Sequence, residues 1–158
     1  MSTASAWSVA LNGIEGAMVE VEVAEGGGLP RTVLVGLPDA ALSQAKERVR
    51  AAVTGAELPW PNGLVTINLS PANLPKTGTH YDLAIATAAL AAIDKVPKEA
   101  ARNHVCLGEL GLDGRLRRVP GILPALLAAV RSGFDKAIVP ASQEAEASLV
   151  PGVTVWAI

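Results

Sequence analysis

Hydrophobic and polar positions alternate along the chain in short blocks, and the spacing changes from block to block. Val19, Val21 and Val23 are separated by Glu20 and Glu22, a period of two that predicts a strand with one buried face. Other short apolar runs are bounded by Gly, Pro, Asn or Asp, which is typical of strands that end in turns. Strands are predicted over residues 8–11, 18–23, 32–35, 65–69, 105–110, 116–119, 137–139 and 153–158.

A different spacing predicts helices between these strands. Between Asp39 and Gly55 the apolar residues recur every three or four positions, and polar residues occupy the opposite face, as in an amphipathic helix. Asp39 suits the N-cap of this helix and Gly55 its end. Helices are predicted over residues 40–54, 81–93, 122–131 and 143–148. The order of elements indicates one α+β domain, residues 1–158, with helices packed on a mixed sheet.

The composition narrows the class of protein. Half of the 158 residues are hydrophobic, but five are aromatic (three Trp, one Tyr and one Phe), so Ala, Val, Leu and Ile must form the core. The formal net charge of −2 does not support a wholly basic nucleic-acid binder, although it leaves room for a local basic patch. The single cysteine, Cys106, excludes an internal disulfide and a cysteine-rich zinc site.

The chain shows neither a targeting segment nor a nucleotide-binding motif. Its first residues contain no basic segment followed by a long apolar stretch, as a signal peptide would. Its apolar runs are shorter than the roughly 20 residues that span a membrane, so we expect a cytoplasmic protein. A GxxxxGK[ST] phosphate loop is absent from the sequence, so we do not expect this chain alone to hydrolyse ATP.

Residues 65–87, VTINLSPANLPKTGTHYDLAIAT, place a polar loop between a predicted strand and a predicted helix. Proteins often bind anions or place catalytic groups at such a helix N-terminus. Lys76, His80 and Asp82 are therefore candidate contacts to an anion or a partner. Each has a plainer interpretation, with Lys76 solvated, His80 a hydrogen-bonding residue and Asp82 a helix cap. Their spacing, with Glu109, does not require a metal site, and we expect none.

Basic residues cluster modestly in two places. Arg115, Arg117 and Arg118 follow an Asp-Gly turn between two predicted strands, and we expect them to contact DNA or a neighbouring subunit. A second basic group, on the helix predicted over residues 40–54, is diluted by acidic residues and is interpreted as a solvated face. It consists of Lys46, Arg48 and Arg50.

Three longer blocks resemble the N-terminal domain of the ComM/YifB family of magnesium chelatase-like AAA+ ATPases. They are VLVGLPDAALSQAKERVRAAV, VTINLSPANLPKTGTHYDLAIATAAL and CLGELGLDGRLRRVPGILPALLAAV. The blocks occur in the order of that family, and the resemblance runs from about Trp7 to Ile158. It implies the fold of the Lon protease C-terminal domain, which is ribosomal protein S-five domain 2-like. It also implies that an AAA+ module and a magnesium chelatase-like C-terminal region follow this domain in the intact protein.

The resemblance to Lon also bears on catalysis. Lon-type proteolysis needs a serine nucleophile and a lysine base. His80 stands at the serine position in this resemblance, or Thr79 or Tyr81 if the alignment shifts by one residue. Leu123 stands at the lysine position, and residues 99–135 contain no lysine. The resemblance thus implies that this chain is not a Lon-type peptidase and has no catalytic residues.

The expected function follows from the family. The resemblance implies a non-catalytic domain that supports ring assembly or DNA engagement in a homo-hexameric, ATP-driven motor for branch migration during natural transformation. ATP and Mg²⁺ would bind elsewhere in the intact protein, and no cofactor is expected in this chain. Two alternatives stay open. One is a peptidase or hydrolase in which Lys76 activates Ser70 or Thr79, and the other is a protein-interaction module.

Overall fold

The computed structural model describes residues 2–158 and contains nine strands in that range. Seven of them form the main sheet: Ser2–Asn12 (β1), Glu15–Gly26 (β2), Arg31–Val35 (β3), Leu64–Ser70 (β4), Val105–Cys106 (β5), Lys136–Val139 (β8) and Thr154–Ala157 (β9). A separate ribbon pairs Glu109–Leu110 (β6) with Leu116–Arg117 (β7).

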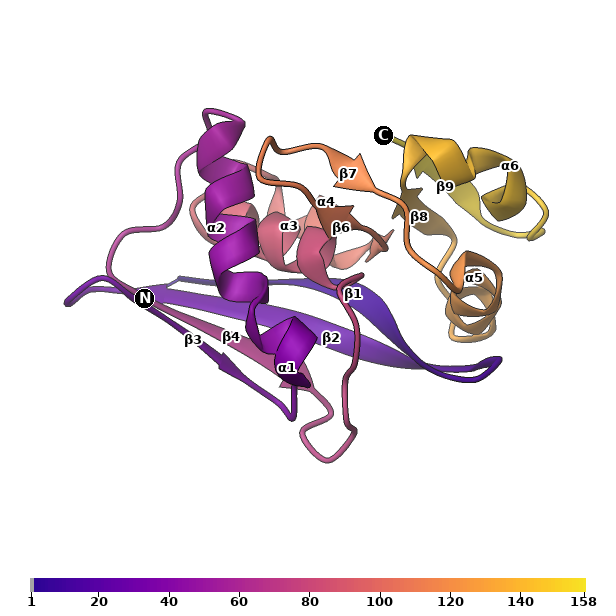
Figure 1. Ribbon diagram of the computed structural model, residues 1–158, viewed down its shortest axis with the longest axis horizontal. Coiled ribbons are helices and arrows are strands. Elements are labelled where there is room, and N and C mark those ends of the chain that lie inside the picture. The colour runs from indigo at the N-terminus through magenta and orange to yellow at the C-terminus, as the bar shows by residue number, and fades with distance from the viewer. Residues whose placement is uncertain (1) are drawn as a thin grey trace.

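The main sheet has the order β3–β4–β2–β1–β5–β8–β9 (Figure 1). Strand β2 runs antiparallel to both β1 and β4, whereas the other four neighbouring pairs are parallel. The hairpin β1–β2 is longer than predicted, since it pairs residues from Ser2↔Glu25 to Asn12↔Glu15. The α+β prediction with a mixed sheet is confirmed.

The helices are Ala40–Ser43 (α1), Ala45–Gly55 (α2), Asp82–Ala92 (α3), Lys98–Arg102 (α4), Ile122–Arg131 (α5) and Glu144–Ala147 (α6), with a 3₁₀ turn at Ala141–Gln143. Helix α3 is buried along almost its whole length, as its uniformly apolar sequence requires. Its alanines leave the room that lets it lie close to β1 and β2.

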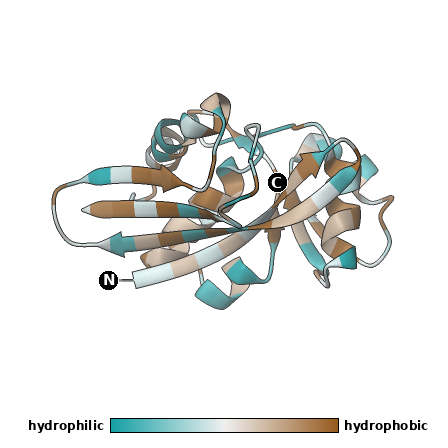
Figure 2. Ribbon diagram, turned by 90° about the horizontal axis from the view of Figure 1, so that it is seen from below, coloured by the Kyte–Doolittle hydropathy of each residue, from teal (hydrophilic) through white to brown (hydrophobic). Residues whose placement is uncertain are grey.

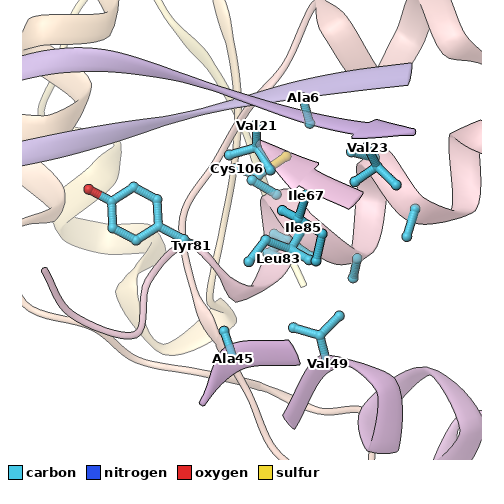
Figure 3. Packing of buried hydrophobic residues seen from close by; sticks show 14 of the residues in the cluster. Ala6, Val21, Val23, Ala45, Val49, Ile67, Tyr81, Leu83, Ile85 and Cys106 are labelled. Carbon is cyan, nitrogen blue, oxygen red and sulfur yellow. The ribbon is translucent and has the colours of Figure 1, made fainter. Parts of the chain in front are cut away.

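Side chains of β1 alternate between two cores. Ala6 and Ala10 belong to a cluster that includes residues of α2, α3 and α4, and Figure 3 shows part of it. Val9, which points to the opposite face, belongs to a second cluster built around α5. Alternation along a strand therefore places helices on both faces of the sheet. Figure 2 shows hydrophobic and hydrophilic residues following one another along neighbouring strands.

Several local predictions are confirmed and others are corrected. Asp39 caps α1, because its Oδ1 accepts a hydrogen bond from the Leu42 N–H at 2.7 Å. The helix predicted over residues 40–54 is interrupted at Gln44. Gly55 is the last residue of α2. Only glycine fits there because another loop lies close, and a Cβ would be 2.4 Å from the Leu112 carbonyl oxygen.

The strand predicted over residues 105–110 is divided into β5 and β6. At the division the Gly108 N–H donates to the His80 carbonyl oxygen at 3.1 Å, so the chain leaves the main sheet beside the N-terminus of α3. The single-turn helix α4 has no counterpart among the predicted helices, because five residues are too few for a helical period to show.

Candidate functional site

The loop from Pro71 to Tyr81 is organised around the buried side chain of Lys76. Its side chain is fully buried, and its ammonium donates to the carbonyl oxygens of Gly36 at 2.7 Å, of Leu69 at 2.9 Å and of Pro71. A lysine ammonium has three N–H groups, so all three are used. Lys76 thus ties the end of β3, the end of β4 and the loop together.

This geometry corrects the expectations for Lys76. Its amine has no N–H left for an anion in this arrangement, and it is not solvated. Burial lowers the pKa of Lys76, while the three carbonyl oxygens favour its protonated form. Such a lysine acts as a structural cation that closes the loop.

Neither hydroxyl of the alternative dyad is hydrogen-bonded to Lys76. The Ser70 hydroxyl accepts from the Asn68 side-chain amide at 3.2 Å. The Thr79 hydroxyl donates to the Glu109 carboxylate at 2.5 Å. Because a general base must reach the proton that it removes, the arrangement does not support a displaced dyad.

The N-terminus of α3 is closed by its own chain. The Asp82 N–H donates to the Thr79 carbonyl at 3.3 Å, and the Leu83 N–H donates to the Gly108 carbonyl at 3.2 Å. These backbone donors are the groups that would otherwise hold an anion. The carboxylate of Asp82 also lies in this first turn, which adds a negative charge where an anion would bind.

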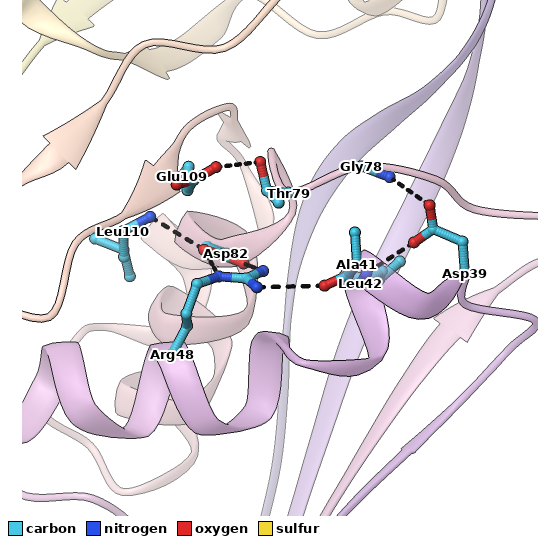
Figure 4. A network of polar contacts seen from close by, with 9 residues as sticks. All are labelled: Asp39, Ala41, Leu42, Arg48, Gly78, Thr79, Asp82, Glu109 and Leu110. Atoms are coloured by element: carbon cyan, nitrogen blue, oxygen red, sulfur yellow. Dashed lines mark hydrogen bonds and ion pairs between the residues drawn. The ribbon is translucent and has the colours of Figure 1, made fainter.

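Asp82 forms a buried ion pair rather than the expected cap. Its two carboxylate oxygens accept from Nε and Nη2 of Arg48 at 2.9 and 2.8 Å, and Oδ2 also accepts from the Leu110 N–H at 3.1 Å (Figure 4). Burial raises the pKa of Asp82, and the Arg48 guanidinium opposes that shift. The pair joins α2, α3 and β6, so the interpretation of Arg48 as part of a solvated face is wrong.

Further contacts extend this network to both sides. Arg48 also donates to the Ala41 carbonyl, and Asp39 accepts from the Gly78 N–H at 3.2 Å through the oxygen that does not cap α1. Together with the Thr79–Glu109 bond, these contacts fix the loop against α1 and the β6–β7 ribbon (Figure 4). Sequence patterns do not reveal the role of Arg48, since its partner Asp82 lies 34 residues away. Glu109, considered from the sequence with His80 and Asp82 only as a metal ligand, instead holds Thr79, 30 residues away.

His80, at the nucleophile position implied by the resemblance, is also held internally. Its Nε2 lies 2.6 Å from the Val9 carbonyl oxygen, and its ring lies 4.1 Å from that of Tyr81, centroid to centroid. Burial lowers the pKa of His80, which favours the neutral imidazole with Nε2 as the donor. Leu123, at the position of the base, is an aliphatic residue of α5 that packs against the second core.

The hairpin arginines differ from these internal groups. Arg115, Arg117 and Arg118 are all exposed, on and around the β6–β7 ribbon. Arg115 makes a loose ion pair with Asp113 at 3.9 Å, with 87% of its side chain exposed, and such surface pairs contribute little. Their guanidinium groups are therefore available to a partner.

Residues 2–158 contain neither a metal-binding cluster nor a membrane-spanning helix. No group of three or more His, Cys, Asp or Glu side chains in this range is arranged to hold a metal ion. None of the helices in the same range has the length and apolar character needed to cross a membrane.

Known proteins resemble this chain over most of its length. The family described as Subunit ChlI of Mg-chelatase matches residues 19–143. An uncharacterized protein of Mycobacterium tuberculosis is 52% identical over 98% of this chain, and the competence protein ComM of Haemophilus influenzae is 41% identical over 95%. These alignments cover 31% and 29% of the two relatives, so the chain spans about a third of their length.

A weaker similarity supports the fold. Lon protease 2 of Bacillus subtilis is 31% identical over 56% of this chain and 16% of its own length. The mixed sheet flanked by helices is consistent with a Lon-like domain. The resemblance to ComM and YifB is thereby confirmed, and the chain belongs to the ChlI family of magnesium chelatase-like proteins.

Proposed function

We propose that this domain is a non-catalytic part of a ring-forming, ATP-driven motor that processes DNA, and that the β6–β7 ribbon contacts the DNA. The observation that carries the proposal is that some polar side chains are hydrogen-bonded inside the domain while others are exposed. Lys76, His80 and Asp82 are committed to internal contacts, whereas the arginines that follow the Asp113–Gly114 turn are exposed.

Family membership supports the wider setting of the proposal. ChlI-like relatives are about three times as long as this chain, which leaves room for an AAA+ module that binds ATP and Mg²⁺. A homo-hexameric ring of such modules would present six copies of the ribbon to one DNA molecule. The name of the Haemophilus relative, a competence protein, supports a role in recombination of imported DNA, such as branch migration.

The chemistry of the contact would be electrostatic. Arginine binds phosphate oxygens through two parallel N–H groups, and each neutralised phosphate releases counterions. Contacts from these arginines to phosphate oxygens would position the DNA without reading its sequence. We therefore expect binding that depends on salt and on DNA structure, with little dependence on sequence.

The test is DNA binding by the intact protein that carries this domain, measured on forked DNA at several salt concentrations. Replacing Arg115, Arg117 and Arg118 with Ala should weaken binding and reduce the slope of log K against log salt by about 0.9 for each phosphate that the variant no longer neutralises. Arg102→Ala and Arg131→Ala, which remove exposed arginines on α4 and α5, are the matched controls. An unchanged slope in the triple variant would refute the DNA contact.

A further inference from the structure

Strand β3 forms an edge of the main sheet and has one neighbour, β4 (Figure 1). Arg31 donates its N–H to the Gly63 carbonyl at 3.1 Å, so Arg31, Val33 and Val35 direct their backbone groups towards β4. In a parallel pair the intervening residues direct theirs the opposite way. The N–H and C=O groups of Thr32 and Leu34 thus face outward, and within residues 2–158 no second strand pairs with them.

Beyond Pro30 and Arg31 at its start, this edge lacks the usual protection against pairing. Natural edge strands are commonly blocked by proline, inward-pointing charge or a bulge. Here β3 reads Arg-Thr-Val-Leu-Val and pairs with β4 in an unbroken register. Val35 is 42% exposed and Leu37, just beyond the strand, is 54% exposed. The edge therefore offers two outward donor–acceptor pairs and apolar surface beside them.

An open pocket of about 620 Å³ lies between β3 and α2, next to this edge. We call it the β3–α2 groove, and its lining residues are Thr32, Lys46, Glu47, Arg50, Ala51, Thr54 and Gly55. Its volume is typical of ligand-binding clefts. A groove between an edge strand and a helix is the geometry in which a peptide adds to a sheet, with backbone bonds on one side and side-chain contacts on the other.

The charge of the groove indicates which peptide fits. Two of the lining residues, Lys46 and Arg50, are basic and lie one turn apart on α2. The lining includes one carboxylate, that of Glu47, so the groove is positively charged. The ion pairs formed within residues 2–158 involve Arg48, Arg115 and Lys136, so Lys46 and Arg50 have no carboxylate partner there. A peptide with carboxylates opposite α2 would supply one.

We propose that the β3–α2 groove binds an extended, acidic peptide segment, which adds to the sheet as an eighth strand through the backbone of Thr32 and Leu34. A second copy of this chain fits less well. The main-sheet edge strands that another copy can offer, β3 and β9, carry no carboxylate, and β3 adds the positive charge of Arg31. The ribbon strand β6 carries Glu109, but that carboxylate already accepts from the Thr79 hydroxyl. This proposal is independent of the DNA contact, which uses a different element.

The probes are two fluorescein-labelled hexapeptides, Glu-Val-Glu-Val-Glu-Val and its Lys-for-Glu counterpart, titrated into the 158-residue chain and followed by fluorescence polarisation. We expect saturable binding of the acidic peptide and much weaker binding of the basic one. Amide shifts in NMR spectra of the labelled protein should map to β3 and α2. Equal binding of the two peptides, no saturable binding of either, or shifts confined to other elements would overturn the proposal.

Two sets of variants separate backbone pairing from charge. Thr32→Pro removes an N–H that faces outward and takes no part in the ladder with β4, so the edge strand should tolerate it; it should abolish binding, whereas Thr32→Ala should not. Lys46→Glu with Arg50→Glu should weaken binding about five- to tenfold, as expected for two surface ion pairs. Lys136→Glu, on β8, is the control.

The variants also distinguish the other possible occupant. If Thr32→Pro does not fold, the double variant Lys46→Glu with Arg50→Glu decides alone. Unchanged binding of the acidic peptide by that variant refutes the proposal. A dimer that sedimentation detects in the wild-type chain and that Thr32→Pro dissociates would assign the edge to a second copy, and would overturn the peptide site.

Discussion

Replacing Lys76 with methionine tests whether the loop depends on one buried cation. Methionine keeps most of the length and the apolar stem of the side chain but removes all three N–H donors. The carbonyl oxygens of Gly36, Leu69 and Pro71 would then lose the ammonium donor that they share. We expect the loop to loosen from the ends of β3 and β4, and the domain to become less stable.

The structure sets the size of this effect. The contacts to Gly36 and Pro71 are partly accessible, so water can replace the amine there, whereas the contact to Leu69 is buried. An unsatisfied buried carbonyl costs about 1–3 kcal/mol. Relief from burying a charge offsets part of the cost of breaking these bonds. The net decrease in the free energy of unfolding should be about 1–2 kcal/mol, which is a measurable share of the roughly 5–15 kcal/mol of a typical domain.

Urea unfolding, followed by circular dichroism, measures this decrease. Lys136→Met, which changes a lysine on β8 with 47% of its side chain exposed, is the matched control and should change stability by less than about 0.5 kcal/mol. Equal stabilities of the Lys76 and Lys136 variants would show that the three carbonyl contacts contribute nothing, and the assignment of Lys76 as the closing cation would fail.

Three further predictions use other buried groups. Arg48→Met should lower the free energy of unfolding by about 3–5 kcal/mol, because it leaves the Asp82 carboxylate buried and unpaired. Adding Asp82→Asn should restore part of that stability in a double-mutant cycle. Additive effects of the two substitutions would contradict the pairing. The pKa of His80 is lowered in the folded chain, so the unfolded chain binds the extra proton as pH falls below about 6.5, and stability should decline there. Thermal unfolding from pH 7.5 to 5.5 should show a smaller decline in His80→Gln, and an identical decline would point to other groups. Burial raises the pKa of the Cys106 thiol to about 12, so a thiol reagent should label the native chain only as fast as it unfolds, and rapid native labelling would refute that burial.

Local patterns predict the features whose cause lies within a few residues. Asp39 is recognisable as a cap because its partner, Leu42, is three residues away. The helix predicted over residues 122–131 matches α5, since an apolar period and a following Gly133 mark both its face and its end. The family resemblance likewise depends on residue order and needs no coordinates.

Local patterns do not predict the contacts of the polar loop. Lys76 resembles a surface residue because loop lysines are usually solvated. Its acceptors include the carbonyl of Gly36, 40 residues earlier in the chain, and backbone acceptors leave no trace in a sequence pattern. Arg48 resembles part of a charged helix face for the same reason, as its partner Asp82 is 34 residues away.

By itself, the sequence determined the family and most of the alternation of helices and strands. These depend on the identity and spacing of residues along the chain. Only the tertiary structure decided which polar groups are used internally and which remain free. Lys76 and Asp82 are held by contacts between distant segments, whereas the hairpin arginines and the outer edge of β3 stay exposed, because packing and pairing depend on which elements become neighbours in space.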